Sequence, residues 1–252
     1  MDVLLSSVQG NIARIMLNRP EKRNALNADL LRALKVEFVR LKTDESIKVI
    51  IIEAAGKAFC AGADLAYLRE MSTFSAMENL ADSQLLQETF HEIYSSPKPV
   101  IAKVHGAAIA GGCGLASVCD IVVAAEQKSK FGYSEVKIGF IPAVVMVYLL
   151  RKIGDTQARR LLLSAETISG KEAERLGLVT YCVEDEKLDE FTNTIAYTLS
   201  GNSASSMALV KEMMVNLQGM SLESGLRYAA SMNAFARMTE DCKAGIASFL
   251  NS

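Results

Sequence analysis

The chain has 252 residues, half of them hydrophobic, and its 27 basic and 29 acidic residues leave a formal net charge of -2. This length allows one large domain, or a core with a smaller appendage, and the balanced charge argues against a broad surface for nucleic acid or anionic membranes. The N-terminus has no basic region before an apolar stretch, and no segment reaches the roughly 20 apolar residues that cross a bilayer. We therefore expect a cytoplasmic protein with no nucleic-acid or membrane partner.

The cysteines and histidines favour neither a disulfide framework nor a metal site. The five cysteines are odd in number and form no C-x-x-C motif, a pattern typical of thiols in a reducing compartment. The two histidines, His91 and His105, lie far apart and lack metal-ligand spacing. We expect metal-free chemistry and no permanently bound cofactor.

The first elements in chain order are a hairpin, a helix and a buried strand. Apolar residues alternate over residues 2–8 and 11–17, with Gln-Gly between them, and this predicts a β-hairpin. Asn27 then precedes a stretch of helical apolar spacing, and the β-branched run at residues 47–54 predicts a fully buried strand. The result is a strand-strand-helix unit.

A similar order follows further along the chain. Residues 99–108, 112–118 and 120–126 predict a strand, a helix and a strand, and residues 167–183 predict a helix leading into a strand. Ser169 and Glu172 have the spacing of a capping box at the start of that helix. The fold class is therefore predicted to be α/β.

From about Lys187 the pattern becomes helical throughout. Residues 205–217, 221–238 and 240–250 are amphipathic with a period of 3.6, and they are rich in methionine, which suits packing on a core or on another subunit. We divide the chain into a core of residues 1–190 and a helical C-terminal region of residues 191–252.

The segment from Lys103 to Pro142 carries the strongest chemical signal. Gly111, Gly112 and Gly114 would let the main chain approach a ligand closely, and a helix opening near Gly112 would direct unpaired N–H groups outward. Such N–H groups can hold a developing oxyanion. Because Glu135 follows in an otherwise neutral run, the segment indicates proton transfer on a carbonyl compound.

A dinucleotide-binding oxidoreductase is an alternative for the same glycines. Gly112, Gly114 and Ser117 give G-x-G-x-x-S after a predicted strand, and an acid follows about twenty residues later. The match is poor, because Ser117 replaces the third glycine and the motif lies in the middle of the chain.

Four motifs, taken in order, resemble the crotonase superfamily of enoyl-CoA hydratases and isomerases. They are NRPEKRNALN at residues 18–27, KAFCAGADL at 57–65, GGCGLASVCD at 111–120 and FGYSEVKIGFIP at 131–142. The resemblance implies a crotonase-like spiral of strand-strand-helix turns with a helical C-terminal region, assembled as a homotrimer or homohexamer. It also implies an acyl-CoA substrate, with coenzyme A entering as part of that substrate.

The resemblance assigns roles to individual residues. The backbone N–H groups of Ala63 and Gly111 would form an oxyanion hole for the thioester enolate, and Glu135 would be the catalytic acid–base. The remaining residues would contact coenzyme A or shape its pocket; they are Lys22, Arg23, Ala25, Ala61, Asp64 and Leu65. For Asp64, its place before an apolar helical stretch favours a helix N-cap over a role in catalysis.

The chain departs from the family pattern at Gly114, where hydratases generally carry a first glutamate. Hydration needs a base for water and a proton donor for the α-carbon, whereas one carboxylate can move a proton from C2 to C4 of a 3-enoyl thioester. Gly114 therefore favours 3-enoyl-CoA to 2-enoyl-CoA isomerisation by Glu135 alone. An enoyl-CoA hydratase, including a branched methylglutaconyl type, and a noncatalytic acyl-CoA binder remain the alternatives.

Overall fold

The structure is a computed structural model that describes residues 2–250, apart from the side chain of Leu65. Two sheets run through it, and successive turns of the chain add one strand to each. The first sheet has the spatial order β1 (Leu4–Gln9), β2 (Ile12–Leu17), β3 (Val49–Ala54), β5 (Val100–Val104), β7 (Ile121–Ala125) and β10 (Tyr181–Val183). The second has the order β4 (Ala58–Cys60), β6 (Ala107–Ile109), β8 (Lys130–Gly132) and β9 (Thr167–Ser169).

Strand pairing follows from the hydrophobic pattern. β1 and β2 form the predicted antiparallel hairpin, in which Leu4 lies opposite Leu17, and Gly10 in the turn adopts a φ of +60°. From β2 to β10 the first sheet is parallel, and Val49–Ile52 of β3 are fully buried, as their β-branched run predicted.

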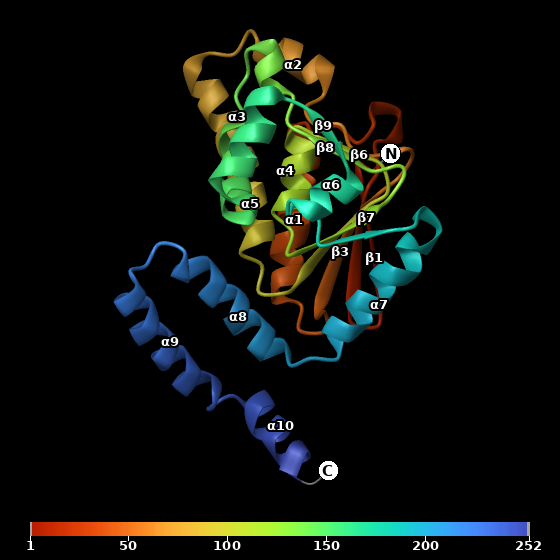
Figure 1. Cartoon of the computed structure of the whole chain (residues 1–252). Coiled ribbons are helices and arrows are strands. Elements are labelled where there is room, and N and C mark those ends of the chain that lie inside the picture. The colour runs from red at the N-terminus through yellow and green to blue at the C-terminus, as the bar shows by residue number, and fades with distance from the viewer. Residues whose placement is uncertain (1, 251–252) are drawn as a thin grey trace.

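Helices and short 3₁₀ turns connect and cover the sheets (Figure 1). The α-helices are α1 (Ala28–Thr43), α2 (Leu65–Met71), α3 (Ala76–Tyr94), α4 (Gly111–Ser117), α5 (Ala143–Ser164), α6 (Gly170–Arg175), α7 (Leu188–Ser200), α8 (Ala204–Leu217), α9 (Leu222–Ala236) and α10 (Glu240–Leu250). The 3₁₀ turns are η1 (Pro20–Lys22), η2 (Glu135–Ile138) and η3 (Asp185–Lys187).

Helix caps agree with the sequence signals in one case and only in part in another. The side chain of Asn27 accepts the N–H of Leu30 at the start of α1. The Ser169 hydroxyl accepts the N–H of Glu172, but the capping box predicted there is incomplete, because the Glu172 carboxylate binds Arg160 and Arg175 instead.

Two apolar clusters hold the core together. The larger one fills the space between the two sheets and the helices α1, α3, α4 and α5. The smaller one lies on the other face of the first sheet, where Leu188 and Ala196 of α7 pack with residues such as Ile51 and Val123. The domain boundary expected at residue 190 falls inside α7, and the division into two regions stays a prediction.

Helices α8 to α10 extend from this body as an arm (Figure 1). Among their described residues only Lys211 is buried, while several large apolar side chains are exposed, among them Met214, Leu226 and Phe235. Within residues 2–250, no helix combines the length and the apolar character needed to span a bilayer.

Candidate active site

A cavity of about 700 Å³ brings together residues from five separate parts of the chain. Its wall includes Ala61 and Ala63 after β4, Gly111 at the start of α4, and Glu135 in η2. The wall also includes Leu26, Leu31 of α1, and side chains of α2, α3 and the first turn of α5. The three residues expected to carry the chemistry, Ala63, Gly111 and Glu135, therefore line one space.

The peptide of Ala63 is held on both sides by Leu26. The N–H of Leu26 donates to the carbonyl of Gly62 at 2.6 Å, and the N–H of Asp64 donates to the carbonyl of Leu26 at 3.0 Å. Gly62 permits this turn because it adopts a φ of +88°, and a Cβ there would lie 2.9 Å from the carbonyl oxygen of Ile109. No acceptor within residues 2–250 takes the N–H of Ala63.

Gly111 is the first residue of α4 and presents an N–H that the helix cannot use. Ala110 before it has a φ of +52° and a ψ of -124°, a strained conformation for a residue with a side chain. The N–H of Ala110 donates to Gly132 at 2.7 Å, which fixes this turn, while the N–H of Gly111 has no acceptor in the described chain. Two unpaired backbone donors thus border the cavity.

Glu135 is an acid in an apolar setting. It is 9% exposed, and its Oε2 atom is buried without a hydrogen-bond partner among the described residues. Burial raises the pKa of this carboxyl above its ordinary value of 4.5, although a hydrogen bond to its own backbone acts in the opposite direction. Lys137 forms no ion pair with it. A buried carboxyl with one unpartnered oxygen and a raised pKa is suited to proton transfer.

Two of the three glycines predicted to approach a ligand serve packing instead. A Cβ at Gly112 would lie 2.1 Å from the carbonyl oxygen of Cys60, so this residue allows α4 to pack against β4. A Cβ at Gly114 would lie 2.1 Å from Cγ1 of Val145 and 3.1 Å from Phe90. The backbone at Gly112 and Gly114 packs against other residues of the chain and leaves no room for a ligand. The glycine motif therefore does not support dinucleotide binding.

Substituting Gly114 tests how tightly this contact is packed. We expect Gly114→Ala to destabilise the protein by about 1–3 kcal/mol, since overpacking a filled core displaces side chains. Adding Val145→Ala should recover part of that loss, because it removes the atoms that the new methyl group meets. Urea unfolding of both single variants and the double variant measures this coupling, and additive losses would contradict it.

The segment at residues 19–25 contacts residues 61–64 and so supports the loop that carries Ala63. Arg19 forms an ion pair with Asp64 at 2.8 Å, and Asp64 also accepts the N–H of Ala66 as the expected N-cap of α2. Burial opposes ionisation of Asp64, but Arg19, the Ala66 N–H and nearby Lys22 together leave its pKa below 3.8. Sequence reasoning did not single out Arg19, whose partner lies 45 residues away.

The other predicted coenzyme A contacts occupy different positions around the site. Lys22 and Arg23 are exposed, and the carbonyl of Arg23 accepts the N–H of Ala61 at 3.0 Å, so both lie beside the loop that carries Ala63. Ala25 is buried, and its carbonyl accepts a hydrogen bond from Arg19. Leu65 begins α2, and its side chain lies outside the described part of the structure.

Comparisons with known proteins identify similar sequences and structures that match nearly the whole chain. The family described as enoyl-CoA hydratase/isomerase matches residues 7–252. A Thermus thermophilus protein named provisionally as an enoyl-CoA hydratase is 41% identical over 241 residues, which cover 96% of this chain and 95% of that protein. The 2,3-dehydroadipyl-CoA hydratase of Escherichia coli is 33% identical over 251 residues, which cover 99% of this chain and 96% of that protein. The structure of an enoyl-CoA hydratase from Shewanella pealeana gives a TM-score of 0.94 at 32% identity, and the match covers 99% of this chain and 93% of that one.

Proposed function

The chain belongs to the enoyl-CoA hydratase/isomerase family, and from this premise we propose that it adds water to a 2-enoyl-CoA thioester. In this proposal Glu135 is the single acid–base residue, and the N–H groups of Ala63 and Gly111 form the oxyanion hole. The observation that carries the proposal is the buried, unpartnered Oε2 atom of Glu135 in the same cavity as two unpaired backbone donors. The hydratase names of the relatives support addition of water over the other reactions of the family.

One carboxylate can perform hydration if its two roles follow one another. Glu135 first takes a proton from water while the water oxygen bonds to C3, and the electrons of the C2=C3 bond move to the thioester oxygen. The Ala63 and Gly111 N–H groups stabilise the resulting enolate, for which one backbone donor is typically worth about 3–4 kcal/mol. Glu135 then gives the same proton to C2, so atoms and charge balance and the residue returns to its ionised form.

Isomerisation of a 3-enoyl-CoA is the second candidate. It is favoured by the contact of Gly114 with Val145, because the place where a second carboxylate could hold a water molecule is filled by an apolar side chain. In that reaction Glu135 would carry a proton from C2 to C4, and no water would be consumed. The same oxyanion hole would hold the dienolate.

Assays with two substrates separate the candidates. We expect the protein to convert crotonyl-CoA to its 3-hydroxy product faster than it converts 3-hexenoyl-CoA to the 2-enoyl isomer. Faster conversion of 3-hexenoyl-CoA would establish isomerisation as the main reaction. Binding of both thioesters without conversion of either would support the noncatalytic binder instead.

The cavity also bears on the acyl group. Lys137 lines it and forms no ion pair within residues 2–250, whereas Asp82 on another part of the wall accepts the hydroxyl hydrogen of Tyr67. We propose that Lys137 accommodates a second carboxylate on the substrate, as a methylglutaconyl-type thioester would supply. The dicarboxylic substrate named for the Escherichia coli relative supports this proposal.

Lys137→Met should therefore raise KM for a dicarboxylic enoyl-CoA such as glutaconyl-CoA by up to about fivefold, the equivalent of about 1 kcal/mol, because it removes an ion pair made by an exposed side chain at the cavity wall. KM for crotonyl-CoA should stay within about twofold, since that substrate carries no second carboxylate. Steady-state kinetics with both thioesters measures the difference. An equal increase for both substrates would assign Lys137 to the phosphates of coenzyme A.

The remaining proposals concern coenzyme A, assembly and compartment. We propose that the exposed side chains of Lys22 and Arg23 contact the phosphates of coenzyme A, while Ala25, Ala61, Asp64 and Leu65 shape its pocket. Helices α8 to α10, with exposed apolar side chains, would join copies into a homotrimer or homohexamer. The buried free thiols support a reducing compartment, the cytoplasm.

A further inference from the structure

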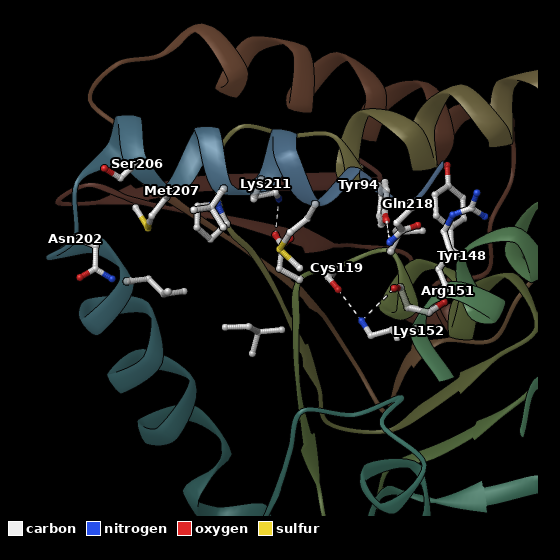
Figure 2. Close-up of a pocket in the computed structure, with 18 of the residues that line it drawn as sticks. Tyr94, Cys119, Tyr148, Arg151, Lys152, Asn202, Ser206, Met207, Lys211 and Gln218 are labelled. Carbon is white, nitrogen blue, oxygen red and sulfur yellow. Dashed lines mark hydrogen bonds and ion pairs between the residues drawn. The ribbon is translucent and has the colours of Figure 1, made fainter. Parts of the chain in front are cut away.

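A second cavity, of about 570 Å³, lies between α8 and the body of the molecule (Figure 2). Two lysines reach it from different elements. The positive charge of Lys211 of α8 is compensated, because its ammonium group forms an ion pair with the carboxylate of Asp120. The same group also donates to the carbonyl of Lys98. Lys152 of α5 has no such carboxylate partner within residues 2–250.

Lys152 instead donates to the end of α4. Its Nζ atom donates to the carbonyl of Cys119 at 2.7 Å and to the carbonyl of Ser117, the last residue of α4, at 3.1 Å (Figure 2). The Ser117 carbonyl is one that a helix end leaves unsatisfied, and the Cys119 carbonyl lies two residues beyond that end. A cation there also interacts favourably with the helix dipole. Burial lowers the pKa of Lys152, while Cys119 and Asp120 act in the opposite direction.

The other end of the same helix borders the candidate active site. α4 has seven residues, so its ends are separated by roughly 10 Å, and Gly112–Ser117 are all buried. Gly111, with its unpaired N–H, is the first residue. A short, buried helix fixed at Ser117 leaves Gly111 little freedom to turn.

We propose that Lys152 is a positioning residue for the oxyanion hole. It anchors the C-terminal end of α4 and places a positive charge at that end of the helix, whose first residue would present the Gly111 N–H to the enolate oxygen. This inference rests on the proposed function of Glu135, Ala63 and Gly111. A unit charge at roughly 10 Å, in a medium of intermediate dielectric constant, should change the stability of the enolate by about tenfold.

The enolate itself provides the readout. Acetoacetyl-CoA forms an enolate but has no double bond to hydrate, so its ultraviolet absorbance when bound reports the enolate fraction. We expect Lys152→Met to lower the equilibrium constant for enolate formation by about tenfold, and to lower kcat for crotonyl-CoA similarly with little change in KM. Lys152→Arg, which keeps the charge and donors, should recover most of both quantities.

Two further variants separate positioning from stability. Lys152→Gln keeps a donor for the carbonyls without the charge, and its comparison with Lys152→Arg decides the question if Lys152→Met fails to fold. Lys211→Met is the matched control, because it removes a lysine from the same cavity that does not contact α4. It should lower the melting temperature and leave the enolate fraction unchanged.

The outcomes distinguish this inference from the function beneath it. Enolate fractions in Lys152→Met and Lys152→Gln equal to that of the wild type would overturn the role of Lys152 alone. A loss in Lys211→Met as large as that in Lys152→Met would do the same, because it would mark both as structural. If the wild type binds acetoacetyl-CoA without forming its enolate, the proposed oxyanion hole fails, and this inference fails with it.

Discussion

Glu135→Gln is expected to lower kcat for the preferred enoyl-CoA by roughly 100- to 10,000-fold, the usual contribution of one general acid–base group. The amide has nearly the shape of the carboxylate but cannot take a proton from water or from C2. KM should change little, because in the proposed site the thioester is held by the Ala63 and Gly111 N–H groups and by contacts to coenzyme A, which this substitution leaves in place. Steady-state kinetics with purified protein measures kcat and KM. Glu186→Gln, at an exposed position, serves as the surface control.

The same substitution should not reduce stability at pH 7. Burial raises the pKa of Glu135 above 4.5, so the folded protein binds this proton more tightly than the unfolded chain does. The free energy of unfolding therefore falls as pH rises from the unfolded-state pKa, about 4.5, through the higher pKa of the folded state. Replacing it with a neutral amide should keep or raise the melting temperature at neutral pH while activity falls. A fall in both would indicate a structural role for Glu135.

Gly111→Pro is expected to lower kcat by roughly 100- to 1,000-fold, because it removes one of the two proposed oxyanion donors. Gly111 is the first residue of α4, and proline is tolerated at that helix position, where its missing N–H breaks no helical bond. The new ring would also stand where the enolate oxygen is expected. The enolate fraction of bound acetoacetyl-CoA should fall together with kcat.

Gly111→Ala is the matched control for that experiment. It keeps the N–H and adds a Cβ that would lie 3.0 Å from Cδ1 of Leu26, at the end of a flexible side chain. We expect it to retain most of the activity, and circular dichroism should show that both variants fold. Equal losses in the two variants would assign the effect to crowding against Leu26 and would remove the N–H from the mechanism.

Local signals in the sequence predicted much of this fold. The alternation around Gly10 predicted β1 and β2, and the run that ends at Ala54 predicted β3. Asp64 before LAYLREM predicted the cap of α2. α3 was not predicted, although Ser75 and Glu78 form a complete capping box at its start. Its apolar periodicity is weak, because the buried residues of α3 are only Thr89, Phe90 and Ile93, near its C-terminal end.

Features that depend on distant contacts could not be read from the chain. Gly112 and Gly114 look equivalent to Gly111 in sequence, yet their roles follow from the positions of Cys60 and Val145. The pairing of Arg19 with Asp64 and the contact of Lys152 with α4 also join separate elements. Of the residues to which the resemblance assigned roles, Ala61, Ala63, Gly111 and Glu135 line one cavity, and their roles stay predictions.

Exchange of the C2 protons of butyryl-CoA in D₂O tests the central claim most directly. This saturated thioester can be neither hydrated nor isomerised, so exchange requires only a base and a site that stabilises the enolate. We expect the wild type to introduce deuterium at C2, as followed by proton NMR, and Glu135→Gln to bind butyryl-CoA without doing so. Exchange that continues in Glu135→Gln, or bound butyryl-CoA that gains no deuterium with the wild type, would contradict this account.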